Sequence, residues 1–254
     1  MANLQRIYYI NLDRKEARRN NIESYFPDDP RLTRISAVDG TSQRHIVTEN
    51  RSFFVNDDLQ RAIDYELDMN PDKIEPEYQC YRTDIHFAVM GNALSHFGTW
   101  EAAAKDLGHD SDVALVMQDD AIISDDFFVD VERIISDIPA DAKVVWLSRH
   151  SCAIGGHFVK VNFDEEPDID ALFEKRKNDT IGNLRLNCNP CSLAYLVTKA
   201  GAKWLVQRTH SVTGAMDNHM NCLLYHAGIQ YATYKPYMTS DTKNFRSDIF
   251  TEAP

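Results

Sequence analysis

The stretch VALVMQDD at residues 113–120 decides the fold that we expect for this chain of 254 residues. Its apolar run is too short for a free-standing helix and is typical of a strand buried on both faces, as in parallel sheets. Two carboxylates, Asp119 and Asp120, follow at the carboxyl end of this strand, where open α/β sheets bind their ligands. Adjacent acidic side chains there can hold a hard divalent cation against a diphosphate. The alternative is an acidic turn that caps the helix beginning at Asp125.

The segments around this strand alternate between strand and helix patterns. We expect strands at 7–10, 32–38, 144–147, 192–197 and 230–234, and helices at 15–26, 87–107, 125–138, 199–208 and 216–226. A weaker helical pattern at 57–67 lies in the long connection 41–87, and we expect 150–187 to be mainly loop with an edge hairpin. This order predicts an α/β fold that begins with a strand–helix–strand unit of nucleotide-binding type.

The composition disfavours nucleic acid and anionic membranes as partners. The net charge is −12 and the pI is about 5.1, which disfavours nucleic acid because Lys and Arg supply most of the affinity for phosphate backbones. An anionic membrane would also be a poor partner without a local basic patch, so peripheral membrane contact has weak support. No apolar run approaches the roughly 20 residues of a membrane-spanning helix.

The cysteines indicate a reducing compartment. The chain has five, an odd number, and no apolar signal segment precedes them: Cys80, Cys152, Cys188, Cys191 and Cys222. We therefore expect a cytoplasmic protein. Cys188 and Cys191, in CNPC at 188–191, have the spacing of a zinc or redox pair. A zinc site needs about four ligands, however, and no second such pair exists.

Five short pieces of sequence stand in order along the chain. They are INLDR at 10–14 with Arg18 and Arg19, AVDG at 37–40, Ser95-His96 with Trp100, Asp119-Asp120, and AYL at 194–196 before Gly201-Ala202. In this order and spacing, over about residues 5–235, the chain resembles glycosyltransferase family 25. That family includes bacterial lipopolysaccharide galactosyltransferases and the collagen galactosyltransferases.

The resemblance implies both a fold and a reaction. The implied fold is a single GT-A type domain over 1–254, with a Rossmann-like mixed, mostly parallel sheet flanked by helices. Residues 1–150 would form the nucleotide-sugar and metal half and 151–254 the acceptor half. The implied reaction is the inverting transfer of a hexose, usually galactose, from a UDP-sugar to an acceptor hydroxyl. A bound Mn²⁺ or Mg²⁺ would act as a Lewis acid on the departing diphosphate.

The implied metal ligands are Asp119 and Asp120, with His219 completing the shell. The alternative for His219 is a surface or packing residue of a helix. One position departs from the family, which usually has Glu where this chain has Gln118. If this position is a ligand, a neutral amide oxygen lowers metal affinity. If the side chain only hydrogen-bonds the sugar or a ligating aspartate, the change is tolerable.

Inversion requires a base that takes the proton of the attacking acceptor hydroxyl. Asp217 begins a helix late in the chain, where inverting GT-A enzymes often place that carboxylate, so the resemblance implies it as the base. The alternative is an ordinary first-turn acid stabilised by the helix dipole.

The resemblance also implies a set of residues that bind the donor: Asn11, Arg14, Arg18, Arg19, Asp39, Ser95, His96 and Gln118. Several have plain alternatives. Exposed helix arginines are usually only solvated, an aspartate beside a glycine often serves a turn, and a histidine on a buried helix is often a satisfied core residue. We expect Tyr195 and Trp146 to belong to the core.

Three functions remain open from the sequence. The first is a cytoplasmic metal-dependent glycosyltransferase that extends a surface glycan with galactose. The second is a nucleotidyltransferase that makes a sugar nucleotide, although the amino terminus lacks the usual glycine-rich phosphate loop. The third, suggested by Gln118, is a relative that binds nucleotide or glycan without turnover. Acceptor choice is expected to lie in 41–87 and 150–187.

Overall fold

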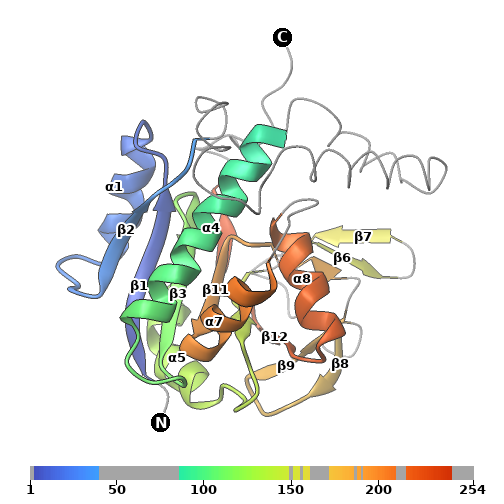
Figure 1. Cartoon of the computed structure of the whole chain (residues 1–254). Helices are drawn as coiled ribbons and strands as arrows, with labels where there is room; N and C mark the ends of the chain where they lie inside the picture. Colours follow the sequence, from blue (N-terminus) through green and yellow to red (C-terminus); the bar gives the residue numbers. More distant parts are fainter. Residues whose placement is uncertain are drawn as a thin grey trace.

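Figure 1 presents the computed structural model of the chain, which describes residues 3–39, 86–148, 151–154, 157–160, 172–185, 188–189, 191–209 and 216–241. The helix predicted at 57–67 lies outside these residues. Among the helices that are described, none combines the length and the apolar character needed to cross a membrane.

The central strand is β3 (Val113–Gln118), and its apolar side chains are all buried, as predicted for a strand covered on both faces. It pairs in parallel with β1 (Leu4–Asn11), which in turn pairs in parallel with β2 (Leu32–Ser36). On its other side β3 pairs with β11 (Ala194–Thr198) in the antiparallel direction. The chain enters β11 from the edge at which β3 ends, so β11 runs back beside it.

Eight strands form the main sheet in the order β2-β1-β3-β11-β5-β12-β9-β8. The strands not yet given are β5 (Val144–Trp146), β12 (Gln230–Thr233), β9 (Ile181–Leu184) and β8 (Phe173–Arg176). β5 and β12 pair in parallel, whereas the pairs β11/β5, β12/β9 and β9/β8 are antiparallel. The sheet is therefore mixed, and β2, β1 and β3 form a continuous parallel part.

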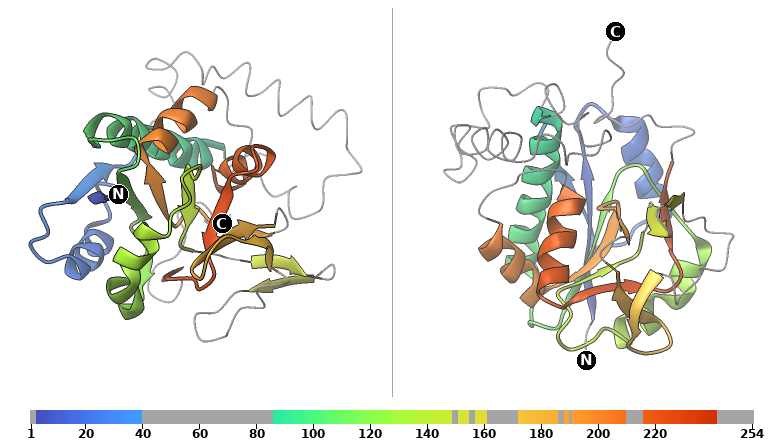
Figure 2. Two further views of the ribbon diagram at one scale, coloured as in Figure 1. Left: turned by 90° about the horizontal axis from the view of Figure 1, so that it is seen from below. Right: turned by 90° about the vertical axis from the view of Figure 1, so that its right-hand side faces the viewer.

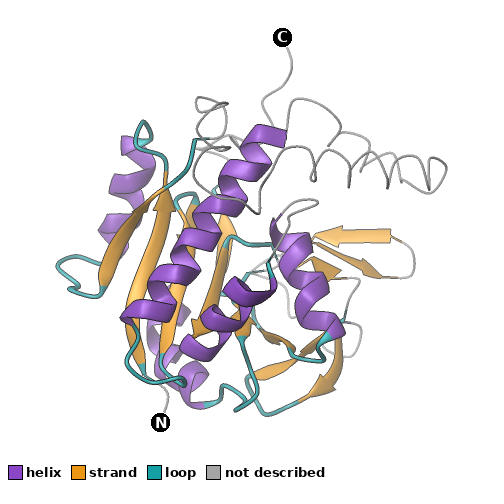
Figure 3. Cartoon of the chain, viewed as in Figure 1, coloured by secondary structure: helices purple, strands orange, loops and turns teal. Residues whose placement is uncertain are grey.

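Helices cover both faces of this sheet (Figure 2). One face carries α4 (His86–Asp106), α7 (Lys199–Arg208) and α8 (Met216–His226). The other face carries α1 (Glu16–Tyr25) and α5 (Asp125–Ser136). The described part of the chain is thus a three-layer arrangement of helices, sheet and helices, which Figure 3 shows by colour.

The pleat of the strands divides the core into two apolar clusters. Val116 of β3 belongs to the same cluster as Trp100 of α4, whereas its neighbour Leu115 belongs to the cluster that contains Phe127 of α5. Successive side chains of a strand point to opposite faces, so an uninterrupted apolar run serves both helix layers. This explains why β3 needs five apolar residues in succession.

Two small sheets accompany the large one. β4 (Ala121–Ile123) pairs with β13 (Met238–Ser240), directly after the two aspartates of the decisive stretch. β6 (Ser151–Ile154) forms an antiparallel hairpin with β7 (His157–Lys160), and β10 (Cys188–Asn189) pairs with β6. The sequence did not predict β4, β13 or β10.

The fold class predicted from the sequence is confirmed, because the domain is α/β with a mixed sheet flanked by helices. The predicted strands and helices also agree with the described ones to within a few residues. The segment 150–187, expected to be mainly loop with an edge hairpin, contains the antiparallel pair β8 and β9 at the edge of the main sheet and a second hairpin, β6 with β7. Strands from both predicted halves build this one sheet, while the assignment of donor and acceptor functions to them stays a prediction.

The turn from β11 into α7 requires a glycine at position 201. Thr198 caps α7 by accepting a hydrogen bond from the Gly201 amide at 2.9 Å. A Cβ at Gly201 would lie 2.0 Å from the carbonyl oxygen of Lys143, which is too close for any real contact. The close approach of α7 to the loop before β5 therefore depends on the missing side chain.

We predict that Gly201→Ala lowers the free energy of unfolding by at least about 2 kcal/mol, since overpacking against backbone displaces whole elements. Gly98→Ala is the matched control, because a Cβ at Gly98 of α4 meets no atom within 4 Å. This control should instead stabilise the protein by about 0.5–1 kcal/mol. Urea denaturation of both variants measures the difference, and equal stabilities would contradict the close approach.

Candidate functional site

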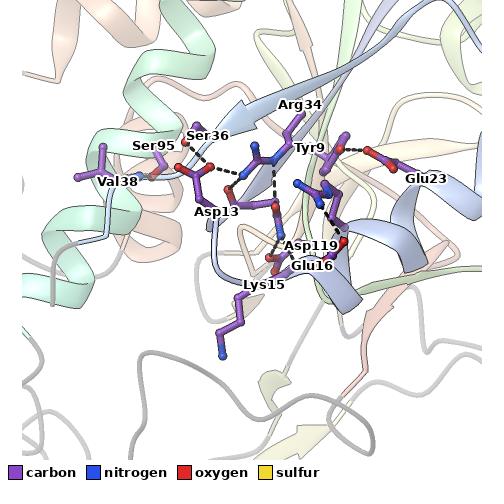
Figure 4. A network of polar contacts seen from close by, with 12 residues as sticks. Tyr9, Asp13, Lys15, Glu16, Glu23, Arg34, Ser36, Val38, Ser95 and Asp119 are labelled. Carbon is purple, nitrogen blue, oxygen red and sulfur yellow. Dashed lines mark hydrogen bonds and ion pairs between the residues drawn. The ribbon is translucent and has the colours of Figure 1, made fainter. Parts of the chain in front are cut away.

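The candidate site lies at one edge of the main sheet. β1, β2 and β3 run in parallel, so their carboxyl ends meet there, and β11 begins at the same edge because it runs in the opposite direction. The backbone N–H of Gln118 at the end of β3 donates to the carbonyl oxygen of Leu193 just before β11, at 2.8 Å. Figure 4 shows part of the polar network that this edge gathers.

Asn11 is the hub of that network. Its side chain is buried, and its Nδ2 donates to Oδ2 of Asp119 at 2.7 Å and to the carbonyl oxygen of Lys15 at 3.0 Å. Its Oδ1 accepts from Nε of Arg34 at 2.9 Å. Asn11 therefore links the end of β1 with α1, β2 and β3, and its predicted contact with the donor stays a prediction.

Asp119 points away from solvent, towards α1. Its Oδ1 accepts from Nη1 of Arg18 at 3.1 Å, while its Oδ2 accepts from Asn11. Arg18 and Asp119 are only 7% and 6% exposed, so this is a buried ion pair. The role of Asp119 as a metal ligand stays a prediction.

Three other predicted donor residues meet beside this pair. Nε of Arg14 lies 3.1 Å from Oδ2 of Asp39, and the Arg14 side chain is 45% exposed at the edge. Oγ of Ser95 on α4 accepts from the Val38 amide at 2.9 Å and donates to the Gly91 carbonyl at 2.6 Å. These contacts join the loop after β1 to the loop after β2, and the loop after β2 to α4, while contact of the three residues with the donor stays a prediction.

The sequence did not single out two residues of this network. Arg34 of β2 pairs with Asp13, and Oγ of Ser36 donates to the same Asp13 oxygen at 2.8 Å (Figure 4). The hydrogen bond from Arg34 is the main reason why the pKa of Asp13 lies below its usual value. Asp13 is part of the quoted INLDR piece, but Arg34 stands in an ordinary strand pattern and carries no local signal.

Arg19 does not join the network in the described structure. Its Nη2 lies 3.5 Å from a carboxylate oxygen of Glu16, one turn earlier on α1, and the Glu16 side chain is 75% exposed. Such i, i+3 pairs on a helix surface are common and weak. Contact of Arg19 with phosphate stays a prediction.

A second polar group joins Gln118 to the core. The Nε2 position of its side-chain amide lies 2.9 Å from Oγ of Ser192 and 3.3 Å from Nε2 of His96. Nδ1 of His96 lies 2.9 Å from the hydroxyl oxygen of Tyr195. That oxygen accepts a hydrogen bond from Nε1 of Trp100 at 2.8 Å. Both ring nitrogens of His96 thus have protein contacts, as expected for a satisfied core histidine.

Burial keeps this group uncharged. His96 is fully buried, and the loss of water lowers its pKa to about 3, so the ring is neutral at pH 7. Tyr195 and Trp146 are also fully buried, which confirms the prediction that both belong to the core. Contact of His96 with sugar or phosphate stays a prediction.

A third group contains Asp120, Asp217 and Cys191. Burial raises the pKa of the Cys191 thiol to about 12, and the negative charges of Asp217 and Asp120 add to the rise. The charges of both carboxylates therefore act on one thiol, although they come from α8 and from the end of β3. Cys191 has φ 56° and its carbonyl oxygen accepts from Oγ of Ser148 at 3.0 Å.

The carboxylates near the end of β3 offer few ligands for a divalent cation. No three His, Cys, Asp or Glu side chains gather as a ligand cluster in the part of the chain that the structure describes. Mg²⁺-type sites, however, often use one or two carboxylates together with substrate phosphates. Asp119 and Asp120, which follow β3, are carboxylates of this kind, and their role as metal ligands stays a prediction.

His219 lies two residues after Asp217 on α8, so the two side chains leave the helix on different sides. Its Nε2 is buried without a hydrogen-bond partner among the described residues, and burial lowers the pKa of the ring. A neutral ring is the form that binds metal. His219 stays a predicted ligand, on a different side of α8 from Asp217.

Comparison with known proteins adds one match. The model of a family described as glycosyltransferase family 25 (LPS biosynthesis protein) matches residues 4–220. A search of curated proteins finds no match to the chain. The matched range runs from β1 into α8 and includes every candidate site residue from Asn11 to His219.

We predict that Arg18→Ala lowers the free energy of unfolding by about 3–5 kcal/mol, because it leaves the carboxylate of Asp119 buried without its cation. Arg19→Ala is the matched control on the same helix, and loss of a surface pair should cost less than about 1 kcal/mol. Chemical denaturation distinguishes the two variants. A loss for Arg18→Ala as small as that for Arg19→Ala would show that the buried ion pair does not support the site.

His96 should make stability depend on pH. Its pKa is about 3 in the folded protein and about 6.5 in the unfolded chain, so below pH 6.5 the unfolded chain binds a proton that the folded protein does not. Stability should therefore fall as the pH falls, with a contribution from His96 of about 1.4 kcal/mol per pH unit below 6.5. Denaturation at pH 7 and pH 5 measures this slope, and it should be smaller in His96→Asn.

Proposed function

Because the chain belongs to glycosyltransferase family 25, we propose that this glycosyltransferase moves galactose from UDP-galactose to a hydroxyl of a glycan, with inversion. The family match, which covers β1 to α8 and all candidate residues, is the observation that carries the proposal. The gathering of Asn11, Arg14 and Asp39 at one edge of the parallel strands supports it, since nucleotides bind at such edges.

The donor binds at the ends of β1 and β2 in this proposal. The chain is acidic overall, so a diphosphate needs local cations, and Arg14 presents a half-exposed guanidinium at this edge. Asp39 orients this guanidinium through its ion pair at 3.1 Å. Arginine suits the task because its planar donors match phosphate oxygens.

Asp120 and Asp119 follow β3 at the same edge, and they remain our candidates for a bound Mn²⁺ or Mg²⁺. When bound, such a cation would stabilise the negative charge of the departing UDP. Asp120 is the better candidate, because the carboxylate of Asp119 already accepts hydrogen bonds from Asn11 and Arg18. In this proposal Asp119 holds the strand end in place for its neighbour.

Asp217 serves as the base in this proposal. As the acceptor oxygen attacks the anomeric carbon opposite the departing diphosphate, its proton passes to the carboxylate of Asp217. The position of Asp217 in the first turn of α8 supports this role, and its charge, like that of Asp120, raises the pKa of the Cys191 thiol. The acceptor would then approach from the side of α8.

The acceptor is a glycan of the cell surface in this proposal, because the family description names LPS biosynthesis. In this proposal the reaction takes place in the cytoplasm, which the odd number of cysteines supports. Incubation with UDP-galactose and manganese tests the reaction class. Release of UDP supports a transferase, release of pyrophosphate a nucleotidyltransferase, and binding without product a relative that does not turn over.

We predict that Asp217→Asn retains UDP-galactose affinity but lowers the rate of transfer by at least about 100-fold, since a general base contributes about that much. Calorimetry measures the affinity and UDP release measures the rate. Asp110→Asn is the control, because Asp110 pairs with Lys203 at the opposite end of β3 and is exposed. Near-normal turnover of Asp217→Asn would remove Asp217 as the base.

We also predict that Asp120→Ala abolishes the increase in UDP affinity that manganese produces, because it removes the proposed ligand. Titration of UDP with and without manganese measures this effect, and Asp110→Asn should keep the full increase. An unchanged response of Asp120→Ala to manganese would place the cation elsewhere.

A further inference from the structure

A buried chain of hydrogen bonds reaches the candidate site at Gln118. It runs from Trp100 to Tyr195, from Tyr195 to His96, and from His96 to the side-chain amide of Gln118. The first three side chains are fully buried, whereas Gln118 is partly exposed at the end of β3. The proposed reaction assigns no role to Tyr195 or Trp100, although both belong to the chain of hydrogen bonds that ends at Gln118.

The direction of this chain follows from its donors. The indole of Trp100 can only donate, so the Tyr195 oxygen accepts from it at 2.8 Å. Among the described residues, the one acceptor near the hydroxyl proton of Tyr195 is Nδ1 of His96, at 2.9 Å. A buried hydroxyl without an acceptor is costly, so Tyr195 donates to Nδ1.

This direction determines the protonation of His96. Since Nδ1 accepts a hydrogen bond, it carries no proton, and the single proton of the neutral ring lies on Nε2. A charged ring would carry protons on both nitrogens and would leave the Tyr195 hydroxyl without an acceptor. The hydrogen-bond count therefore requires the neutral Nε2–H form.

The same argument determines the orientation of Gln118. The Nε2 position of the Gln118 amide lies 3.3 Å from Nε2 of His96 and 2.9 Å from Oγ of Ser192. The Nε2–H group of His96 needs an acceptor at this position, and the Ser192 hydroxyl can donate to an acceptor as well as accept from a donor. The nitrogen and oxygen of an amide have nearly the same shape, so the network decides which occupies a position. The carbonyl oxygen therefore faces His96 and Ser192, and the NH2 group takes the outer position.

We propose that Gln118 is a hydrogen-bond donor to the sugar nucleotide, with its NH2 group aimed into the candidate site by His96, Tyr195 and Trp100. The outer end of the amide has no hydrogen-bond partner among the described residues. A ligand oxygen that accepts hydrogen bonds, on the diphosphate or on the sugar, would complete it. The identity of this ligand rests on the proposed function, whereas the orientation of the amide does not.

This assignment separates Gln118 from any cation. An outward NH2 group cannot coordinate a metal ion, and the carbonyl oxygen that could do so is engaged by His96 and Ser192. From the sequence, Gln118 was either a metal ligand or a residue that hydrogen-bonds the sugar or a ligating aspartate. The structure therefore favours a hydrogen bond to the sugar nucleotide. His96 and Tyr195 act as positioning residues, because they are buried and reach the ligand only through Gln118.

The first test needs no ligand. In protein with ¹⁵N-labelled histidine, NMR of the imidazole nitrogens should show His96 protonated at Nε2 and not at Nδ1, with His96→Asn identifying the signal. Tyr195→Phe removes the donor to Nδ1 and should shift both nitrogen signals. Tyr8→Phe is the control, because it removes another buried hydroxyl, bonded to Asp106 at 3.0 Å. Protonation of His96 at Nδ1 would overturn the orientation.

The second test measures the ligand contact. Gln118→Glu still offers acceptors to His96 and Ser192, but it replaces the outward NH2 group with a carboxylate oxygen. In metal-free buffer, we expect this variant to bind UDP-galactose at least tenfold more weakly than the natural protein. Tyr195→Phe should also weaken binding severalfold, whereas Tyr8→Phe should not.

The two sources of the acceptor oxygen give different results. Equal weakening for UDP and UDP-galactose assigns it to the diphosphate, and weakening for UDP-galactose alone assigns it to the sugar. Unchanged affinity of Gln118→Glu for both ligands would overturn the proposed contact. If the natural protein binds neither ligand, with or without manganese, the proposed function fails, while the NMR result still decides the orientation of the amide.

Discussion

The buried carboxylate of Asp119 accepts hydrogen bonds from Arg18 of α1 and Asn11 of β1, and the geometry of the candidate site depends on this contact. It ties the end of β3 to the first strand and the first helix at a place with little water. An uncompensated charge there would be costly. Because Asn11 also binds Arg34, the same contact extends to β2, and the three parallel strand ends form one rigid edge.

With Asp119 turned inward, its two neighbours face other surroundings. Gln118 reaches His96 and Ser192 in the layer between β3, β11 and α4, whereas the charge of Asp120 acts on the Cys191 thiol, as that of Asp217 does. In our proposals these three adjacent residues serve three purposes: Asp119 supports the strand end, Gln118 contacts the ligand and Asp120 binds the cation. Substitution of the usual family glutamate by Gln118 becomes understandable, because the neutral His96 needs no charged partner and its Nε2–H is satisfied by an amide oxygen.

Much of the fold was predictable because its signals are local. The apolar run at 113–117 predicted a strand with two buried faces, and the spacing of Trp100 and its neighbours predicted α4. The bounds of the edge strands β8 and β9 escaped prediction, because β8 is mostly exposed and the two apolar residues of β9 are separated by Gly182 and Asn183. At the site, Asn11, Arg14 and Asp39 were predictable as polar residues at strand ends, but Arg34 was not, because its partner Asp13 is distant in the sequence.

The sequence by itself determined the α/β class, the order of strands and helices, the family resemblance and the edge where polar residues gather, because each depends on periodicity or on short motifs. Only the tertiary structure decided which way those side chains point. The inward turn of Asp119 and the antiparallel β11 that brings Ser192 and Tyr195 beside Gln118 join residues about 70 to 110 positions apart in the sequence. Such contacts arise from packing of whole layers, which no local pattern encodes.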